Sequence, residues 1–594
     1  MTYLENQRTR LALFFGLLLL VDWYLYFWNV GHFFQADTMF LLYHRPTSVV
    51  EFLREFIKTH PSGWYRPLAN EIIEPILYPL LGLNPAGYRI PVYAVFIADT
   101  VAVYALALAI TRRQLAAAIA TFFFSIHTTN AFTTYDAGYL PELLYTFFFV
   151  ASALAYLRYL DHRTRSALGI SLACFAGALL SKEAAATLPF VLVALHIFKG
   201  FTSRKQLFAA GGHFILLGCY LAFAVGYLHV QGVAFDTVLN PPSAKPTGGY
   251  QLILGKTIFE NADYGTSWMF NIPRGWMTES RHLEPGMVTF LNFFRALVVA
   301  LAAFLLLKPE RKVILLGTAW FLITLGPTLP LLNHFLPYYL FLPVVGFSLV
   351  VGTVFAWLYD SIRRFQPVAA PATIVAVFGG LLYVCSISIH ADIRDHMWLG
   401  GSARLARSSL DDLKRLFPAL PSNGTIYIND DEEPLAWHHS SGGLIKMAYN
   451  TKDVSVFYSS AGDPIPERVP ADKLILLRFQ NKRLLDATDV FITNARGFVP
   501  YNNSGKHTLR ISRSEVGVGD LFALEVSGLR DVRVELTYTL NEGRVQLFQT
   551  ILDDQGRAKF DVSEATTKGS YHFLGFKVMS EPDWYRADAA ITVR

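Results

Sequence analysis

Long apolar runs constrain the fold of this 594-residue chain more than any other feature of its sequence. A helix needs about 20 apolar residues to cross the hydrocarbon core of a bilayer. The composition agrees with such crossings, because 53% of the residues are hydrophobic and only 16% are charged, against about 25% charged residues in a typical soluble domain. The sequence therefore predicts a polytopic α-helical membrane protein with about eleven spans. These spans lie near residues 11–30, 89–111, 115–132, 139–160, 166–181, 183–198, 207–230, 287–307, 313–330, 337–359 and 369–390.

Basic residues in the connections set the predicted orientation. They are concentrated in the N-terminal tail and in alternate loops, which the positive-inside bias places in the cytoplasm. The intervening loops, together with everything after residue 390, then lie on the extracytoplasmic side, because the number of spans is odd. The basic residues concerned are Arg8, Arg10, Arg112, Arg113, Arg163, Arg165, Lys199, Arg204, Lys205, Lys308, Arg311, Lys312, Arg363 and Arg364.

The charge and cysteine content argue against two functional classes. The formal net charge is only +5, and no basic run with interleaved aromatics is present, so the sequence indicates no nucleic-acid partner. The three cysteines, Cys174, Cys219 and Cys385, all lie in apolar runs. They indicate packing residues rather than a disulfide framework or a metal site. No tight metal-ligand spacing is visible in the sequence, so we expect no cofactor, with a divalent metal bound by Asp136 and Glu142 as the alternative.

The first outer loop supplies a candidate base and a candidate cation. Asp37 closely follows the first span and is surrounded by aromatic and apolar residues. Burial raises the proton affinity of a carboxylate, which suits a general base; the alternative is a helix N-cap. Arg66 lies between Tyr65 and Pro67. Its guanidinium is planar and always charged, which suits a fixed contact with an anion.

Three further outer corners carry acids, bases or cations. Taken singly, each has an ordinary explanation, such as a polar helix end or a cap with a snorkelling lysine. Because all of them fall on one predicted side of the membrane, they together indicate a pocket at that surface. The residues are His127, Asp136 and Glu142 between two apolar runs, Lys182 and Glu183 at the corner of two short helices, and His334 beside Tyr338 and Tyr339.

Several motifs follow one another in a fixed order along the first 360 residues. They are "WYRPL", "LGLNPAGYR", "SIHTTNAFTTYDAGYLPELL" and "LLSKEAAATLPFVL". In order and predicted sidedness they resemble the membrane portion of transmembrane and TPR-repeat O-mannosyltransferases, which belong with the protein O-mannosyltransferases in the GT-C class of membrane glycosyltransferases. Two features depart from that pattern. The stretch Ala36-Asp37-Thr38 has one acid where the class often has a pair, and no 34-residue repeat follows, which leaves the acceptor open.

The resemblance implies an inverting transferase that moves a sugar, with mannose suggested by the family, from a polyprenyl-phosphate carrier to an acceptor hydroxyl on the extracytoplasmic side. It makes Asp37 the general base. It makes Arg66 and Lys182 the cations that stabilise the departing phosphate, with His127 as a further donor to that phosphate. The acceptor-binding or auxiliary candidates are Asp136, Glu142, Glu183, Tyr65 and His334.

The composition changes after residue 390. An amphipathic stretch, then the buried-strand patterns "GTIYIND" and "DKLILLRF", predict a linker helix and a small α/β module. Alternating segments from about residue 507 predict about seven strands of an Ig-like β-sandwich, which either binds carbohydrate or is structural. The predicted domains are therefore a GT-C-like membrane domain at 1–391, the extracytoplasmic linker and α/β module at 392–490, and the β-sandwich at 505–594.

Two other classes of function remain open at this point. A polytopic transporter or flippase of a lipid-linked saccharide would place charged sites near the bilayer midplane, and a non-catalytic scaffold would only display the C-terminal domains. We expect a polyprenyl-phosphate-linked sugar donor, the lipid bilayer, and a protein, glycan or lipid acceptor as partners. The absent repeats and cysteine-free exterior favour a bacterial inner membrane with a periplasmic C-terminal region, the endoplasmic reticulum membrane being the alternative. In the loop 231–286, Trp268 and Trp276 either stack on a sugar or anchor at the headgroups.

Overall fold

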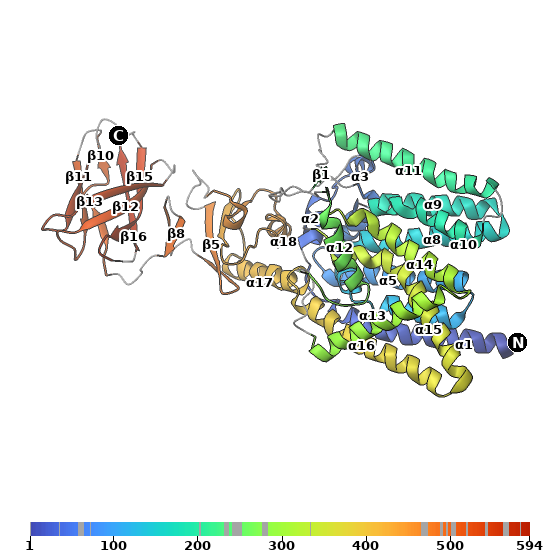
Figure 1. Ribbon diagram of the computed structural model, residues 1–594. Coiled ribbons are helices and arrows are strands. Elements are labelled where there is room, and N and C mark those ends of the chain that lie inside the picture. Colours follow the sequence, from blue (N-terminus) through green and yellow to red (C-terminus); the bar gives the residue numbers. More distant parts are fainter. Residues whose placement is uncertain are drawn as a thin grey trace. The chain divides into compact units, whose positions relative to one another are not determined.

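The fold is described from a computed structural model of the chain (Figure 1). It divides into two compact units, residues 1–401 and residues 402–594, which are treated separately below. The structure describes residues 2–594 apart from residues 35, 58–64, 72, 201–203, 231–236, 240–251, 276–282, 333, 465–472, 487–490, 495–496, 501–505, 518–520, 541–544, 562–568 and 582–583. Trp276 lies outside the described residues.

Each of the eleven predicted spans coincides with a helix of the first unit. The apolar runs therefore located the helices correctly, although the helix ends differ by several residues. The helices are α1 (Thr2–Leu25), α5 (Pro85–Thr111), α6 (Gln114–Ser125), α8 (Leu140–His162), α9 (Arg165–Ser181), α10 (Leu188–Lys199), α11 (Arg204–Val230), α13 (Pro285–Leu305), α14 (Arg311–Leu325), α15 (Phe341–Phe365) and α16 (Ala369–Asp395).

These helices differ in their ability to cross a bilayer. Among the described residues, five helical segments are long and apolar enough to do so, and they contain α5, α8, α13, α15 and α16. Helix α6 has 12 residues, about 18 Å of rise against a hydrocarbon core of about 30 Å. The structure therefore supports an integral membrane protein, while the count of about eleven spans and the predicted orientation remain predictions.

Helix α15 is the centre of the first unit. In its most apolar stretch 94% of the residues are buried, and it packs against α14, α6 and α16 (Figure 1). Glycines allow the close approach: a Cβ added to Gly352 would collide with the carbonyl oxygen of Ala116, and one added to Gly346 would collide with Trp320. Small residues at such crossings let helix backbones approach closely when apolar surroundings offer no hydrophobic gain.

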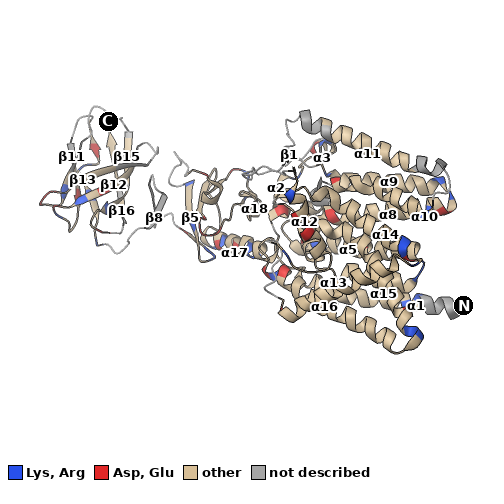
Figure 2. Cartoon of the chain, in the orientation of Figure 1, with Lys and Arg blue, Asp and Glu red and all other residues tan. Residues whose placement is uncertain are grey.

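Short elements connect the long helices, and charged residues gather at the helix ends rather than along the helix middles (Figure 2). Several of these short elements carry the predicted site residues. They are η1 (Phe27–Asn29), α2 (Ala36–His44), α3 (Val49–Glu55), η2 (Pro67–Glu71), α4 (Ile73–Leu81), α7 (Asn130–Thr133), η3 (Ala137–Tyr139), η4 (Glu183–Thr187), β1 (Thr237–Leu239), β2 (Leu252–Leu254), α12 (Lys256–Trp268), η6 (Gly326–Thr328) and η7 (Pro337–Leu340).

The predicted cytoplasmic corners also meet one another. Arg113, at the corner between α5 and α6, forms an ion pair with Asp360 near the end of α15. Lys199, the last residue of α10, pairs with Asp161 near the end of α8 at 2.7 Å. Helix ends that the basic-residue pattern assigns to one side of the membrane are thus neighbours in the fold.

The second unit begins within α17 (Gly400–Leu416) and contains an α/β sheet with strand order β4-β3-β5-β6. The first three strands of that order are parallel and β6 is antiparallel. Asp430 follows β3 and accepts hydrogen bonds from the backbone N–H groups of Leu435 and Ser460, which joins the ends of β3 and β4. The elements are β3 (Thr425–Asn429), α18 (Gly443–Ala448), β4 (Ser455–Tyr458), η8 (Ser459–Ala461), β5 (Leu474–Gln480) and β6 (Arg483–Asp486).

Two further sheets of the second unit share one apolar core, with strand orders β10-β16-β15-β12-β13 and β14-β11-β9. Alternating residues such as Leu524, Leu536 and Phe576 fill this core. The described strands exceed the predicted seven because β10 has only two residues, too few for an alternating pattern to reveal. The strands are β9 (Leu509–Ile511), β10 (Glu515–Val516), β11 (Leu521–Val526), β12 (Arg533–Leu540), β13 (Val545–Ile551), β14 (Arg557–Asp561), β15 (Gly569–Val578) and β16 (Trp584–Val593), preceded by the hairpin β7 (Phe491–Asn494) and β8 (Gly497–Pro500).

Candidate active site

A fully buried arginine fixes the first outer loop against the segment before η3. The Arg89 side chain, near the start of α5, has no exposed surface. Its guanidinium donates to the carbonyl oxygens of Val30 (3.2 Å), Phe33 (3.0 Å) and Tyr135 (2.6 Å), and also to that of His32. Guanidinium carries five N–H donors in a rigid plane, so this one side chain sets the spacing between the two backbone segments.

The candidate base lies at the other end of that first segment. Asp37 is in the first turn of α2 and is half-buried. Its neighbour Thr38 accepts a hydrogen bond from the backbone N–H of Gly138 at 2.7 Å, which ties α2 to η3. Asp136 is buried and caps η3 by accepting from the N–H of Ala137 at 2.7 Å. Both carboxylates lie close enough to the Tyr139 hydroxyl to interact with it electrostatically.

A buried ion pair forms the centre of the site. Lys182 donates to Glu142, and the side chains of the two residues are only 3% and 4% exposed. Glu142 lies in the first turn of α8. Lys182 follows the last residue of α9 in an extended conformation, which turns its side chain inward and the next residue outward. The predicted neighbours Lys182 and Glu183 therefore lie in different environments.

Three tyrosine rings surround the Lys182 ammonium group. Its nitrogen is 4.8 Å from the ring centroid of Tyr339, 5.4 Å from that of Tyr338 and 5.7 Å from that of Tyr145. Such contacts attract a cation to the face of a ring. Burial lowers the pKa of Lys182 below its ordinary value, and the nearby Arg66 guanidinium lowers it further. The nearby carboxylate of Glu183 opposes both effects by favouring the charged ammonium.

The tyrosines also join the cation to the acids. The rings of Tyr139 and Tyr338 have centroids 5.3 Å apart, so Tyr139 contacts one of the rings beside Lys182, and it also interacts electrostatically with the carboxylates of Asp37 and Asp136. The structure thus brings Asp37, Asp136, Glu142 and Lys182 into one connected cluster, although they come from three separate segments.

A second cation lies at the rim of this cluster. Arg66 donates through Nε to Glu183 Oε2 at 2.8 Å and through Nη2 to the other carboxylate oxygen. The Arg66 side chain is 11% exposed and that of Glu183 is 52% exposed. Tyr65 donates to the carbonyl oxygen of Phe56 at 2.7 Å and packs against Phe223. Tyr65 therefore supports the backbone that carries Arg66.

His334 belongs to the same neighbourhood. Its ring lies 6.2 Å from that of Tyr339. Burial lowers the pKa of His334 to about 4, with additional lowering from Lys182 and Arg66. His334 is consequently a neutral imidazole at physiological pH, which adds no further positive charge to the site.

His127 is placed differently from the predicted phosphate ligand. It has no exposed surface. The backbone N–H of Thr129 donates to Nδ1 at 3.3 Å, so Nε2 carries the proton and faces the carbonyl oxygen of Met269 at 3.3 Å. Both ring nitrogens have protein partners. The geometry favours a positioning role for His127, and its predicted contact with a donor phosphate remains a prediction.

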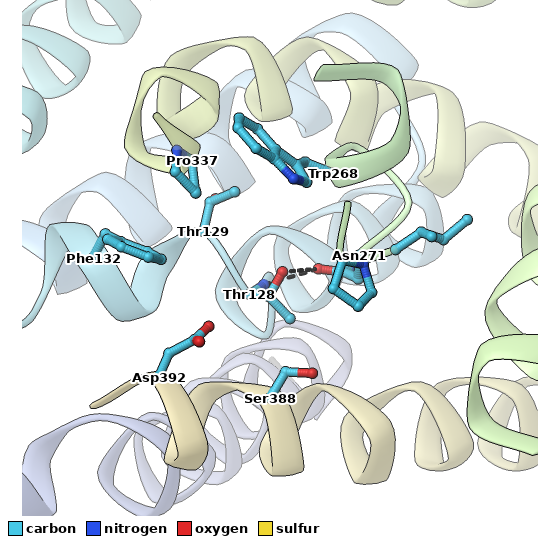
Figure 3. Close-up of a pocket in the computed structure, with 10 residues that line it drawn as sticks. Thr128, Thr129, Phe132, Trp268, Asn271, Pro337, Ser388 and Asp392 are labelled. Carbon is cyan, nitrogen blue, oxygen red and sulfur yellow. Dashed lines mark hydrogen bonds between the residues drawn. The ribbon is translucent and has the colours of Figure 1, made fainter. Parts of the chain in front are cut away.

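A small recess lies on the other side of η7. Figure 3 shows Ser388 and Asp392 projecting from α16 toward Thr128, with Trp268 and Pro337 opposite them. Asn271 accepts from both the backbone N–H and the hydroxyl of Thr128, at 2.8 and 3.0 Å. Its own backbone is in the left-handed region, with φ of 60°, and its buried amide nitrogen has no hydrogen-bond partner among the described residues.

Trp268 lies at this recess rather than on an exposed surface. It is 3% exposed, its ring stacks on that of Phe335 at 5.1 Å, and its indole nitrogen donates to the carbonyl oxygen of Arg274. Burial inside the protein leaves it unsuited to anchoring at lipid headgroups.

Four functional candidates were missed by reasoning from the sequence. Arg89 and Asn271 act through backbone groups that only the folded chain brings near. Asp22 and Asp99 are buried carboxylates within α1 and α5, and their position in apolar runs was a signal, because ionisable residues within spans are usually functional. Asp22 accepts from Ser125, whereas neither oxygen of Asp99 has a hydrogen-bond partner in the described part of the chain.

The described residues contain no group of three or more His, Cys, Asp or Glu side chains arranged to hold a metal ion. Asp37 and Asp136 both interact electrostatically with Tyr139. Whether the reaction needs a metal remains a prediction from the sequence.

Comparison with known proteins gives structural likenesses only. No family model and no curated protein matches the chain. The Archaeoglobus fulgidus oligosaccharyltransferase in complex with Zn and sulfate is 10% identical, with 98% of each chain covered and a TM-score of 0.49. The same organism's oligosaccharyltransferase AglB in complex with an inhibitory peptide and a dolichol-phosphate is 10% identical, with 99% of this chain and 98% of that chain covered and a TM-score of 0.45.

A third such structure, the A. fulgidus oligosaccharyltransferase tethered with an acceptor peptide containing the NVT sequon, is 10% identical, with 98% of this chain and 97% of that chain covered and a TM-score of 0.47. Likenesses at this level carry no argument about activity or ligands. These three are oligosaccharyltransferases, and the finer resemblance to O-mannosyltransferases stays a prediction from the motifs.

Proposed function

We propose that this chain is a GT-C-type membrane glycosyltransferase that moves a sugar from a polyprenyl-phosphate carrier to an acceptor hydroxyl on the extracytoplasmic side, with inversion at the anomeric carbon. The observation that carries the proposal is the cluster in which Lys182 and Arg66 meet the acids Asp37 and Asp136 through a run of tyrosine rings. This cluster supports the proposal because it contains two cations suited to a leaving phosphate and a carboxylate able to take a proton.

The two cations suit the departing phosphate. A transferase stabilises charge that develops in the transition state with donors that are already in place. Lys182 is held by its three tyrosines and Arg66 by a two-point contact with Glu183. The bond from the anomeric carbon to the phosphate oxygen breaks, and its electron pair stays on the phosphate, which these cations neutralise.

Asp37 is the proposed base. It is half-buried at the start of α2, where the acceptor hydroxyl would lose its proton as its oxygen bonds to the anomeric carbon. Asp136 is committed to capping η3, which makes it the better candidate for orienting the acceptor. Mannose as the sugar and a metal-independent reaction are carried over from the sequence resemblance.

The proposal is tested with membranes from cells that produce the chain. Radiolabelled polyprenyl-phosphate sugars are supplied, and transfer of label from the lipid extract to the lipid-insoluble fraction is measured. General-base catalysis contributes about 10²–10⁴-fold, so Asp37→Asn is expected to lower transfer by at least about 100-fold. The matched control is Asp161→Asn, because Asp161 is an exposed ion-pair partner at the opposite helix ends.

The cations are tested in the same way, with Lys182→Met compared to Lys199→Met. We expect loss of transfer only in Lys182→Met. Transfer at the wild-type rate by Asp37→Asn would remove this residue from the base role. Equal behaviour of the two lysine variants would remove the phosphate site, and with it the transferase proposal.

One observation favours a transporter or flippase as the second candidate. Asp99 lies in the middle of α5, fully buried, with neither oxygen hydrogen-bonded in the described part of the chain, and ionisable groups at such depth are typical of transport pathways. A fluorescent polyprenyl-phosphate sugar in proteoliposomes distinguishes the two functions. The transporter would be favoured if the wild type flips the lipid without consuming it as a donor and the Asp99→Asn variant does not flip it.

A further inference from the structure

The buried ion pair leaves no charge for a donor to use. Lys182 is the most enclosed cation of the proposed phosphate site, and Glu142 already neutralises it. Both side chains are almost completely buried, so water neither screens the pair nor compensates a change in its net charge. A monoanionic phosphodiester that approached Lys182 while Glu142 remained an anion would place an uncompensated negative charge inside the protein.

Glu142 is held on one side only. Its Oε1 contacts Lys182, while its Oε2 has no hydrogen-bond partner in the described structure. Buried carboxylate oxygens are normally satisfied, so within the described part of the chain the contact with Lys182 is the one hydrogen bond that holds this carboxylate. An incoming phosphate therefore competes with one contact rather than with a network.

The neighbouring pair shows the contrast. Glu183, the partner of Arg66, is 52% exposed, so it can leave Arg66 and be solvated by water without any change of protonation. Glu142 has no such option at 4% exposure. Displacement of Glu142 is possible at modest cost only if the carboxylate becomes neutral.

Several titratable or charged groups face this pair from the elements packed around it. On α8, Tyr145 faces Lys182; on α5, Asp99 interacts with Tyr145; on η7 the tyrosines 338 and 339 face Lys182, with His334 just before them. Arg66 and Glu183 complete the surroundings. Among these groups Glu142 is the acid in direct contact with the Lys182 ammonium, and is thus the one that a phosphate must replace.

We propose that Glu142 is an internal counter-ion which occupies Lys182 until the donor phosphodiester replaces it, and that donor binding takes up one proton, which Glu142 receives. This inference rests on the proposed function. The charges balance. Before binding there are the Lys182 ammonium, the Glu142 carboxylate, the phosphodiester anion and one proton, which sum to zero. After binding there are an ion pair between the Lys182 ammonium and the phosphodiester, and a neutral Glu142 carboxylic acid. A lipid without an anionic phosphate cannot displace Glu142, so the device selects for the charged carrier.

The probe is citronellyl methyl phosphate, a short prenyl phosphodiester without a sugar. A phosphodiester is a strong acid, so it remains a monoanion throughout the experiment. Its binding to the purified full-length protein in nanodiscs is measured by calorimetry from pH 6 to 8.5, in pairs of buffers with different ionisation enthalpies. The dependence of the heat on the buffer gives the number of protons taken up per ligand.

We expect the wild type to take up close to one proton per ligand at pH 8, with affinity falling about tenfold per pH unit, because binding and proton uptake are linked. Glu142→Gln cannot exchange a proton and competes less for Lys182. It is expected to bind the probe without proton uptake and at least about tenfold more tightly than the wild type at pH 8. Glu142→Asp keeps the acid and is expected to retain the uptake.

The matched control is Glu183→Gln, the same acid-to-amide change in the exposed pair, for which proton uptake is expected to equal that of the wild type. Proton uptake near zero in the wild type, or weaker binding by a folded Glu142→Gln, would overturn the counter-ion role while leaving the transferase proposal intact. No binding by the wild type, or equal binding by Lys182→Met, would instead overturn the proposed phosphate site itself. The wild-type proton count decides the inference even if a variant fails to fold.

Discussion

The pairing of Lys182 with Glu142 leads to a prediction about stability that does not depend on activity. In Lys182→Met the side chain keeps nearly its length but loses its charge, and Glu142 is left as a buried acid without its partner. Breaking a buried pair on one side typically costs about 3–5 kcal/mol. Glu142 limits this cost by taking up a proton. The free energy needed to protonate a glutamic acid depends on the difference between the pH and its unperturbed pKa.

The magnitude follows from that proton. An unperturbed glutamic acid has a pKa of about 4.3, and each pH unit above it corresponds to about 1.36 kcal/mol, so protonation costs about 3.7 kcal/mol at pH 7 and about 1 kcal/mol at pH 5. We therefore expect Lys182→Met to lower the free energy of unfolding by about 4 kcal/mol at pH 7 and by about 1 kcal/mol at pH 5. In the double variant Lys182→Met/Glu142→Gln the dependence on pH should disappear.

Equilibrium unfolding in mixed detergent micelles, followed by tryptophan fluorescence at both pH values, measures these differences. The comparison of wild type, two single variants and the double variant isolates the coupling between the side chains. A loss below about 1 kcal/mol at pH 7, or a loss of the same size at pH 5 and pH 7, would refute the reasoning, because either result means that Glu142 is not a buried charge held by Lys182.

The remaining predictions concern residues that hold the site in place. The Arg89→Lys variant keeps the charge, but the lysine cannot reach all of the carbonyl partners of Arg89. Each lost hydrogen bond to a charged group costs about 1.5–3 kcal/mol, so we expect the free energy of unfolding to fall by about 2–4 kcal/mol. A loss under about 1 kcal/mol, measured by unfolding in micelles, would contradict this prediction. Asn271 has a φ of 60°, where glycine is unstrained, so Asn271→Ala should be about 1 kcal/mol less stable than Asn271→Gly, and equal stabilities would place the residue outside the left-handed region.

Apolar run length was a sufficient guide to where helices form, because a helix in an apolar environment must satisfy its backbone within itself. It was a poorer guide to where they end. The run 115–132 was predicted as one span, but α6 stops at Ser125, since the following polar residues make better use of side-chain hydrogen bonds than of a continued helix. The 12-residue α10 likewise begins only at Leu188, after the turn η4.

The candidate site was only partly readable from the sequence. Lys182, Glu142 and Asp37 stand out because charged residues beside apolar runs are rare, and their types suggest chemistry. Their pairing could not be predicted: the sequence sets Lys182 next to Glu183, yet the fold joins it to Glu142, 40 positions earlier. The extended conformation at Lys182 decides this choice, and a single sequence contains no pattern that specifies it.

Arg89 illustrates a different limit. It forms part of the quoted motif "LGLNPAGYR", and its burial gives it the strongest structural role near the base. Its partners are backbone carbonyl oxygens of residues 30–33 and 135. Every residue has such a carbonyl group, so the residue types at these positions do not reveal the contacts. Reasoning from side-chain types therefore finds the groups that act in a site more readily than the groups that position it.

The polar segment after α6 connects these observations. The end of a helix leaves carbonyl groups without partners inside the helix. Asn130 donates to the carbonyl oxygens of Phe124 and Ser125 at 2.7 and 3.0 Å, and the Tyr26 hydroxyl also donates to that of Ser125 at 2.7 Å. The polar residues between the two apolar runs thus first serve to end a short helix.

The same segment then gains a second use. Two residues between the end of α6 and Asn130 form hydrogen bonds with another segment: Thr128 with Asn271, and His127 with the carbonyl oxygen of Met269. These contacts attach the loop after α12 to the end of α6 and leave the amide nitrogen of Asn271 without a described partner at the recess.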